Sequence, residues 1–265
     1  MRPLMVVLLL ALSVFAYSED CKNIGINGTI YSDTILSEDL RSSGDCLLIG
    51  ADNITLDCAG HTIMGDGTGI GIYAIGRTGI AVRNCRVEKF NYGLRASYSG
   101  SSLFEKNEVS GCYAGAYASS SSSLVFSENK VNSNTIGLYA YDLSSSSFKA
   151  NAVKNNKEHG LEMRFSFGND VKDNDFSGNM IGAGVYSTSE TAISGNDLRG
   201  CYTDYKEESS KSIRYYGNSE DVISGGGWDR IFREAKSVLA IALLIVLFAG
   251  LAVFLGMSMR WKFGR

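Results

Sequence analysis

Apolar residues recur along this chain at a spacing of 22 residues, with a single step of 23. One apolar column consists of Val82, Phe104, Phe126, Phe148, Val171, Ile193 and Tyr215, and a second of Val87, Val109, Val131, Val153, Phe176 and Leu198. A polar column follows the first by three residues and consists of Cys85, Asn107, Asn129, Asn151, Asn174, Asn196 and Asn218. A repeat this short and regular predicts a solenoid whose apolar columns share one core.

The residues after each recurring glycine alternate in character. These glycines are Gly71, Gly93, Gly115, Gly137, Gly160 and Gly184. The first and third residues after them are mostly small or aliphatic, as in Leu94 and Ala96. A period of two is typical of β-strands, because successive side chains point to opposite faces. Three short strands and their corners use up ~22 residues and leave no room for a helix in the repeat.

The predicted fold is therefore an all-β parallel β-helix with three short strands per coil, whose coils stack ~4.8 Å apart. Asparagine suits the corners, since it tolerates left-handed backbone and can form hydrogen-bonded ladders. A second asparagine column, Asn134, Asn156 and Asn179, supports this arrangement. The serine runs at 119–123 and 144–147 fall at equivalent places in successive repeats, so we expect them at corners and outward strand positions.

Two segments carry a family resemblance. The stretches ADNITLDCAGHTIMGDG at 51–67 and SDTILSEDL at 32–40 resemble the first coils of right-handed parallel β-helix proteins of the pectin-lyase-like superfamily. The most similar groups are the NosD-like and the carbohydrate-binding and sugar-hydrolase β-helix proteins. The resemblance covers Cys21 to Ser219 and implies right-handed winding. It is specific for fold and not for activity, because that superfamily contains lyases, hydrolases, adhesins and uncharacterised surface proteins.

The resemblance to NosD-like proteins suggests a copper site, but the residues of this chain do not favour one. Copper sites group His, Met or Cys side chains. The two histidines, His61 and His159, lie about four turns apart, and no such grouping forms around either. We expect His159, beside Gly160, to be an ordinary corner residue, and we expect no copper site.

Both ends of the chain have the pattern of membrane-directed segments. Residues 1–18 combine a basic start, an apolar stretch and small residues at a cleavage position, which predicts a signal peptide. Residues 238–257 are uncharged and would form a helix of ~30 Å, the thickness of one bilayer core, which predicts a transmembrane helix. We expect a single-pass protein of the cell membrane with an extracellular or periplasmic β-helix ectodomain. Its predicted parts are the ectodomain at 19–223 (cap at about 19–50, repeats at about 51–219), a linker and juxtamembrane segment at 224–237, and a cytoplasmic tail at 258–265.

The charge composition argues against one class of binding partner, nucleic acid. The chain carries 28 acidic and 25 basic residues, a net charge of −3. Nucleic-acid-binding modules need a basic face, so nucleic acid is not predicted as a partner. Two glycosylation sequons, at Asn27 and Asn53, lie in the exported part and matter only if the host glycosylates.

Six cysteines in an exported chain suggest disulfides. Cys112 and Cys201 share a column four turns apart, ~19 Å by the rise per turn, and cannot bridge. Cys58 and Cys85 occupy nearly matching places in neighbouring coils, so a bond between them is sterically allowed. Cys21 and Cys46 could tie the cap, although Cys58 could also pair with either. We expect one bridge in the cap, with Cys112 and Cys201 as buried thiols in the second asparagine column.

Outward strand positions suggest a glycan-binding stripe. The second residue after each recurring glycine should point outward, and two further positions lie on the same face. These residues are Tyr73, Arg95, Tyr117, Tyr139, Glu162 and Tyr186, together with Tyr141 and Arg164. Aromatic rings can stack on the apolar faces of sugars, while Arg and Glu bind hydroxyls or carboxylates. Tyrosine is also common in β-sheets for packing reasons alone.

The sequence leaves two classes of function open. The first is a cell-surface protein that binds carbohydrate or acts as an adhesive or structural rod of roughly 8 or 9 turns. The alternative is a membrane-anchored polysaccharide lyase or glycoside hydrolase, for which no catalytic residue is assigned. Asp170, Asp173 and Asp175 could hold Ca²⁺, as lyases of the superfamily do, but they straddle a corner and should diverge. No other cofactor is predicted. Asp57, His61 and Asp66 form another group, which the resemblance places in a structural turn.

Overall fold

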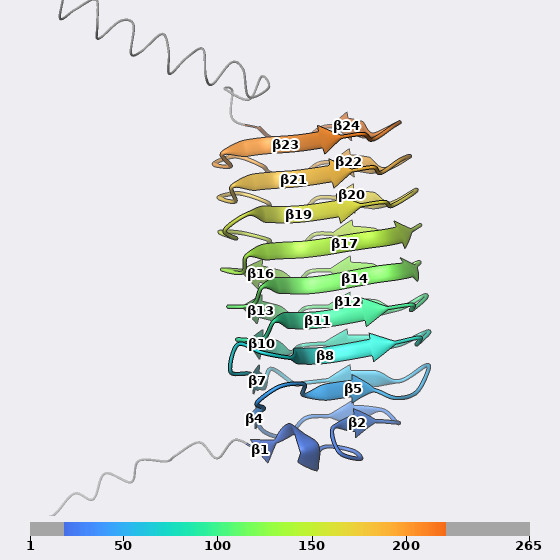
Figure 1. Ribbon diagram of the computed structural model, residues 1–265, viewed down its shortest axis with the longest axis vertical. Coiled ribbons are helices and arrows are strands. Elements are labelled where there is room, and N and C mark those ends of the chain that lie inside the picture. The colour runs from blue at the N-terminus through green and yellow to red at the C-terminus, as the bar shows by residue number, and fades with distance from the viewer. Residues whose placement is uncertain (1–18, 221–265) are drawn as a thin grey trace, which may run out of the picture.

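The computed structural model describes residues 19–220, which form one parallel β solenoid whose coils stack along the long axis of the molecule (Figure 1). The only helix in this range is the short 3-10 helix η1 (Cys21–Asn23). No helix there is long and apolar enough to cross a membrane. The predicted signal peptide, linker, transmembrane helix and cytoplasmic tail lie outside the described residues. The all-β parallel fold is confirmed.

Three parallel sheets form the sides of the solenoid, and sheets B and C have nine strands each. Sheet A contains β1 (Glu19–Asp20), β4 (Leu40–Arg41), β7 (Thr62–Met64), β10 (Arg86–Glu88), β13 (Glu108–Ser110) and β16 (Lys130–Asn132). Sheet B contains β2 (Thr29–Ile30), β5 (Leu47–Ile49), β8 (Ile70–Ile75), β11 (Tyr92–Ser97), β14 (Ala114–Ser122), β17 (Ile136–Ser144), β19 (His159–Arg164), β21 (Ile181–Tyr186) and β23 (Thr203–Glu208). Sheet C contains β3 (Thr34–Ile35), β6 (Thr55–Asp57), β9 (Ala81–Arg83), β12 (Leu103–Glu105), β15 (Val125–Ser127), β18 (Ser147–Lys149), β20 (Asp170–Lys172), β22 (Ala192–Ser194) and β24 (Arg214–Tyr216).

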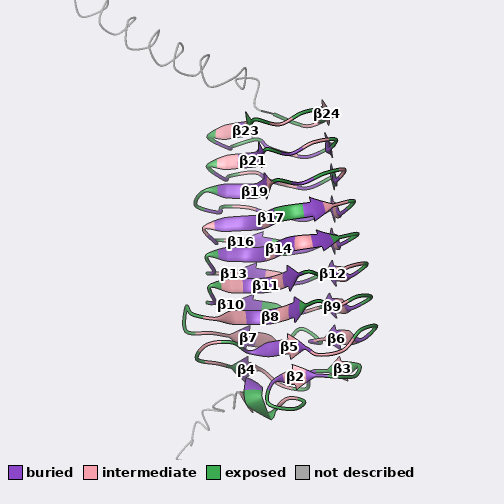
Figure 2. Ribbon diagram, turned by 45° about the vertical axis from the view of Figure 1, so that its right-hand side comes forward, coloured by how far each residue is buried: buried purple, intermediate pink, exposed green. Residues whose placement is uncertain are grey.

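The predicted apolar columns form the core. Phe104, Phe126 and Phe148 stack on one another with ring centroids 4.8 and 5.3 Å apart and nearly parallel planes. All three are buried, as is the second apolar column from Val87 to Leu198. Figure 2 shows the buried positions running through every coil. One residue per coil therefore stacks on its equivalent in the next coil.

Both predicted asparagine ladders are present. The Nδ2 of Asn129 donates to Oδ1 of Asn151 (2.9 Å) and to the carbonyl of Phe104 (2.8 Å). The second ladder joins Asn134, Asn156 and Asn179 in the same way. These amides are buried, and those inside a ladder, such as Asn129 and Asn156, tie their own coil to both neighbours. The ladders thus satisfy corner backbone groups that would otherwise be buried without a partner.

The serine runs differ in part from the expectation. Ser120, Ser123 and Ser145 do occupy corners with left-handed backbone. In contrast, Ser121 and Ser146 point inward, where each hydroxyl accepts a hydrogen bond from a main-chain N–H of the preceding coil. The reason is that a buried corner leaves N–H groups unpaired, and a short hydroxyl can serve them as well as an amide.

Two disulfides close the amino-terminal end. Cys21 is bonded to Cys46, which confirms the expected cap bridge, and Cys58 is bonded to Cys85 as a second bridge between neighbouring coils. Cys112 and Cys201 are buried thiols, as expected. Burial raises the pKa of Cys112 to about 11, so this thiol stays protonated and unreactive at neutral pH.

Candidate functional site

The outer face of sheet B carries two columns of large polar and aromatic side chains. Strand register places Tyr73, Arg95, Tyr117, Tyr139, Glu162, Gly184 and Lys206 in the first outward column. The second outward column contains Ile75, Ser97, Ser119, Tyr141, Arg164, Tyr186 and Glu208. Every residue of the predicted stripe therefore lies on one face.

The register of Tyr186 differs from the sequence prediction. The glycine equivalent to Gly160 is Gly182 and not Gly184, since Leu161 pairs with Ala183. Tyr186 consequently lies in the second column beside Arg164, and Gly184 takes the place in the first column that Tyr186 was expected to fill. Because Gly182 and Gly184 are two residues apart, the sequence of this coil can be aligned with the repeat in two ways. The strand pairing shows that Gly182 is the recurring glycine.

Aromatic rings are in contact along the amino-terminal half of this face. The rings of Tyr117 and Tyr139 lie 5.2 Å apart, and so do those of Tyr92 and Tyr117. The guanidinium of Arg95 sits 5.7 Å from the ring centroids of both Tyr92 and Tyr117. Sequence reasoning missed Tyr92, because it precedes the recurring glycine and was not expected to join the outer face.

The carboxyl-terminal half of the face holds a compact group of four ionisable side chains, here called the His–Tyr cluster: His159, Glu162, Arg164 and Tyr186. The Nε2 of His159 lies 3.0 Å from the Tyr186 hydroxyl, and its Nδ1 lies 3.3 Å from Oε2 of Glu162. Arg164 Nε bonds Glu162 Oε1 at 2.5 Å, and its guanidinium lies 4.4 Å from the Tyr186 ring centroid. The exposed fractions of His159, Glu162 and Tyr186 are only 9%, 5% and 7%.

A β-bulge brings His159 into this cluster. The step from Asn156 to Gly160 is one residue longer than the step from Asn134 to Gly137. The extra residue is absorbed in sheet B. The N–H of Glu158 bonds the carbonyl of Thr135 and its carbonyl accepts from Ile181, while His159 is the residue in register with Ile136. Glu158 and His159 together thus lie opposite one residue of the preceding coil, which is a β-bulge. A β-bulge changes the direction in which nearby side chains point.

Gly184 completes the contact from the next coil. A Cβ at this position would lie 2.9 Å from His159 Cδ2 and 2.9 Å from both Cε2 and Oη of Tyr186. Any other residue in the first column would therefore displace one of the two rings. The single inserted residue and the absent side chain are both departures from the repeat, and both serve the same His159–Tyr186 contact.

Electrostatics favour a neutral imidazole in the cluster. Burial lowers the pKa of His159 below its ordinary value, against the opposing effect of Glu162 and Glu158. The Nδ1 contact with Glu162 lacks hydrogen-bond alignment and is electrostatic. A carboxylate on that side favours a proton on Nδ1, which leaves Nε2 to accept the Tyr186 hydroxyl. Burial also raises the pKa of Tyr186, opposed by Lys206 and Arg164.

These shifts predict a loss of stability in acid. With its pKa below 6.5 in the folded protein, His159 binds a proton at higher pH in the unfolded chain. Stability should fall as pH drops through about 6.5, because unfolding then takes up protons. Glu162, Glu158, Lys206, Arg164 and the Tyr186 hydroxyl surround this imidazole.

Thermal melts between neutral and mildly acidic pH should therefore show a decreasing melting temperature, and His159→Gln should flatten this upper part of the curve. The carboxylates with lowered pKa, such as Asp57, act in the same direction only below about pH 4. A wild-type melting temperature that rises on acidification to pH ~5.5 would contradict the assignment of a lowered His159 pKa.

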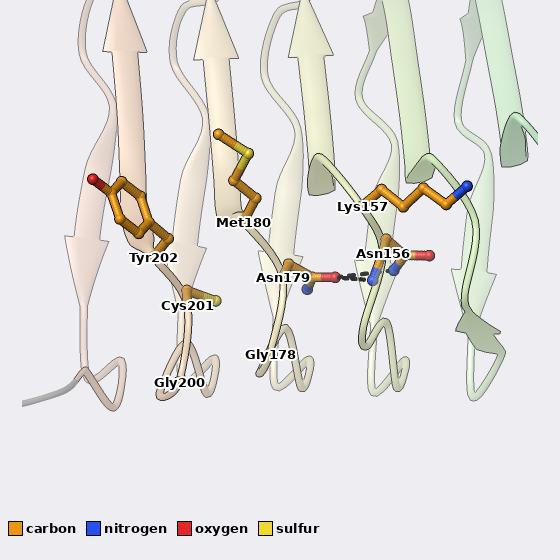
Figure 3. Close-up of a pocket in the computed structure, with 8 residues that line it drawn as sticks. All are labelled: Asn156, Lys157, Gly178, Asn179, Met180, Gly200, Cys201 and Tyr202. Carbon is orange, nitrogen blue, oxygen red and sulfur yellow. Dashed lines mark hydrogen bonds between the residues drawn. The ribbon is translucent and has the colours of Figure 1, made fainter.

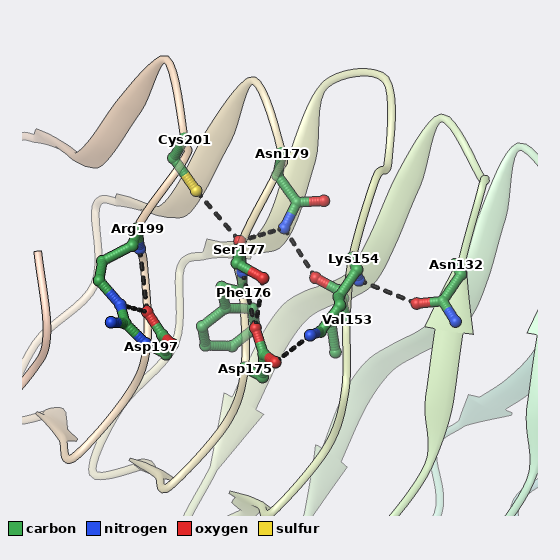
Figure 4. A network of polar contacts seen from close by, with 10 residues as sticks. All are labelled: Asn132, Val153, Lys154, Asp175, Phe176, Ser177, Asn179, Asp197, Arg199 and Cys201. Carbon is green, nitrogen blue, oxygen red and sulfur yellow. Dashed lines mark hydrogen bonds and ion pairs between the residues drawn. The ribbon is translucent and has the colours of Figure 1, made fainter. Parts of the chain in front are cut away.

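The three aspartates considered for calcium do not converge. Asp175 is held by Lys154 and by Ser177, as Figure 4 shows, and although burial raises its pKa these bonds outweigh it and lower the pKa overall. Asp170 and Asp173 are exposed on sheet C and its corner. Within residues 19–220 no three His, Cys, Asp or Glu side chains form a group that could hold a metal.

The other residues singled out from the sequence have local roles. Asp57 binds Arg83 (2.9 Å) and Asn84 (3.0 Å), and His61 lies 3.2 Å from Asp39. Asp66 bonds Thr68 in its own turn. The sequon residues Asn27 and Asn53 are exposed and have left-handed backbone.

A shallow hollow at the corner between sheets A and B offers little chemistry. Figure 3 shows its lining, with Lys157, Met180 and Tyr202 projecting around the ladder pair Asn156 and Asn179. Both amides are already hydrogen-bonded, since Nδ2 of Asn156 donates to Oδ1 of Asn179 and Nδ2 of Asn179 donates to the carbonyl of Val153. The outer face of sheet B, with its ionisable and aromatic groups, is the stronger candidate site.

Comparison with solved structures shows the same fold in two epimerases and in a phage tailspike. A variant of the periplasmic alginate epimerase AlgG is similar with a TM-score of 0.63 and 17% identity over 71% of this chain and 51% of that chain. The Azotobacter vinelandii mannuronan C-5 epimerase AlgE6 A-module gives 0.57 and 15% over 77% of each chain. The enzymatically active domain of bacteriophage CBA120 tailspike protein 2 gives 0.59 and 13% over 72% of this chain and 36% of that chain. This chain thus spans about half of the AlgG structure and about a third of the tailspike domain.

No curated protein matches the sequence. A family model described as "Right handed beta helix region" matches residues 45–200, more than half of the chain. This match confirms the right-handed winding that the resemblance implied, and the structural neighbours are β-helix proteins of the pectin-lyase-like kind. The chain belongs to the right-handed β-helix family.

Proposed function

We propose that this protein binds an extended carbohydrate along the outer face of sheet B. The observation that carries the proposal is the first outward column, in which Tyr73, Arg95, Tyr117 and Tyr139 follow one another at one residue per coil. Strands repeat every ~4.8 Å, a step comparable to the length of one pyranose unit, so a glycan parallel to the solenoid axis meets an equivalent side chain with each sugar. The relatives of the same fold that act on alginate and mannuronan support a carbohydrate ligand.

Residues 1–18 and 238–257 support export and anchoring of this site at the cell membrane by one carboxyl-terminal helix. In that arrangement the solenoid displays its binding face outside the cell. Cell fractionation, with protease treatment of intact cells, tests this placement. Recovery of the full chain in the soluble fraction would contradict it.

The double substitution Tyr117→Ala and Tyr139→Ala should reduce glycan affinity by at least about tenfold, because two stacked rings are removed from the middle of the column. The melting temperature should change little, since both rings are only half buried. Affinity electrophoresis and calorimetry with polymannuronate and a neutral β-glucan measure the effect.

Tyr216→Ala is the matched control, because Tyr216 is an exposed strand tyrosine on sheet C. It should leave binding unchanged. Equal affinities for the double variant, the control and the wild-type protein would refute a binding role for the tyrosine column.

A second candidate function is proton transfer to or from a bound uronate, as in a polysaccharide lyase. The convergence of the bulge at His159 and the absent side chain at Gly184 favours it, because neither is needed to stack coils. The His159–Tyr186 pair can exchange a proton, and Arg164 can face the sugar carboxylate. Hydrolysis is less favoured, since it needs two carboxyl groups across the glycosidic bond and the cluster supplies only Glu162.

A further inference from the structure

Two phenylalanines interrupt the polar corner between sheets B and C. At the end of the sheet B segment in each coil, one position is occupied by Gly76, Tyr98, Ser120, Asp142, Phe165, Ser187 and Ser209, all with φ between 45° and 65°. Ser120 and Asp142 still lie within β14 and β17, and the others directly follow their strands. Two residues later, main-chain bridges connect Thr78, Gly100, Ser122, Ser144, Phe167, Ser189 and Lys211. Apart from Tyr98, the other residues of these two columns are glycine or polar, and among these coils that of β19 is the one with an aromatic residue, Phe165 and Phe167, in both columns.

Local structure does not explain these aromatic residues. Phe165 has φ 50°, a left-handed conformation that is an outlier for a bulky side chain. Its side chain is 55% exposed, and that of Phe167 is 49% exposed, so neither contributes much to the core. The corner adopts this conformation in every coil, so a small or polar residue would serve there, and neither the corner nor the core requires a phenylalanine.

The position of these rings connects them with the outer face of sheet B. The Phe165 ring lies 5.3 Å from the Tyr141 ring, edge to face. The main-chain N–H of Phe165 donates to the Tyr186 carbonyl at 3.0 Å. Tyr141 belongs to the exposed stretch of β17 that Figure 2 shows in green. Tyr141, Phe165 and Phe167, here called the aromatic ledge, thus continue the binding face around the corner at the level of the His–Tyr cluster.

We propose that the aromatic ledge is a second carbohydrate subsite, which takes the apolar face of a pyranose unit next to the unit held over Glu162 and Arg164. The proposal rests on the proposed function and extends it from one column to a site that turns the corner. The surroundings match a sugar, because Asp142, Ser144 and Ser189 border the rings and can bond hydroxyls. A protein partner would need a larger continuous apolar area than the three rings of the ledge provide.

Phe165→Ser tests the subsite without disturbing the fold, since serine is the natural residue at this corner in the coil of Ser187. Tyr98→Ser is the matched control: Tyr98 occupies the same corner position three coils away, with φ 52° and 71% exposure. Both substitutions relieve the same strain, so both should keep or raise the melting temperature. Binding of polymannuronate and neutral β-glucan oligosaccharides to the full-length protein is measured by calorimetry.

For the oligosaccharide that the wild-type protein retains, Phe165→Ser should weaken affinity at least about fivefold and Tyr98→Ser should leave it unchanged. If Phe165→Ser binds like Tyr98→Ser while Tyr117→Ala with Tyr139→Ala loses binding, the ledge is no subsite and the proposed function stands. If the wild-type protein binds none of the oligosaccharides, the proposed function fails and the subsite with it.

Discussion

Tyr186→Phe should reduce turnover of a uronate-containing glycan by at least about 100-fold, which is the usual contribution of one positioned acid or base. The substitution removes only the hydroxyl that lies 3.0 Å from Nε2 of His159. The ring remains beneath the Arg164 guanidinium, at 4.4 Å, so glycan affinity should stay within about twofold of the wild-type value. Formation of new chain ends from polymannuronate and pectate, alongside calorimetric binding, separates the two effects. A wild-type protein that acts on neither polymer would remove proton transfer as a function and leave the binding proposal intact.

Gly184→Val tests the geometry of the same pair without removing either reacting group. A side chain at this position would meet His159 and Tyr186 at 2.9 Å and force them apart. Turnover should therefore fall about as far as in Tyr186→Phe, and the double variant should be no worse than either single one, because both act on one contact. Additive losses in the double variant would show that Gly184 has a role of its own.

The regular part of this molecule could be predicted from the sequence because residues one repeat apart lie next to each other once the coils stack. Phe104, Phe126 and Phe148 are 22 residues apart, and in a parallel solenoid that spacing leaves them adjacent. The same holds for the ladder asparagines, whose side chains bond the next coil. Tyr117 and Tyr139 were placed correctly on the outer face for the same reason.

The His–Tyr cluster could not be predicted in this way, because it depends on two departures from the repeat. His159 was expected to be an ordinary corner residue, but the inserted residue moves it into strand β19 and onto the outer face. Gly184 was expected to be the recurring glycine. The sequence prediction therefore missed that the first outward column has no side chain at Gly184 and that Tyr186 pairs with Arg164. The one longer step in the repeat was the available signal, and its position between Asn156 and Gly160 identifies the affected strand.

The coil of β19 thus combines regular and irregular features. Its inward residues Leu161 and Met163 keep the core continuous and are fully buried. Its outward residues Glu162 and Arg164 replace tyrosines of the preceding coil, and its corner carries Phe165 and Phe167 in place of polar residues. A solenoid tolerates such local change, since each coil contacts only its neighbours and the core columns can remain unaltered.

Phe126→Ala should lower the free energy of unfolding by about 3–5 kcal/mol, the usual loss for a phenylalanine that is fully enclosed. Phe126 is 2% exposed and lies between Phe104 and Phe148, so its removal opens a cavity that breaks two ring stacks at once. The stacked column cannot close the gap, because strand pairing on either side fixes the distance between coils. Guanidinium unfolding followed by circular dichroism measures the loss.

Phe165→Ala is the control, since that ring is exposed and its backbone is strained. It should lower the free energy of unfolding by less than about 0.5 kcal/mol. Equal losses for the two variants would mean that the phenylalanine column is not the continuous interior on which the stacking of the binding face depends.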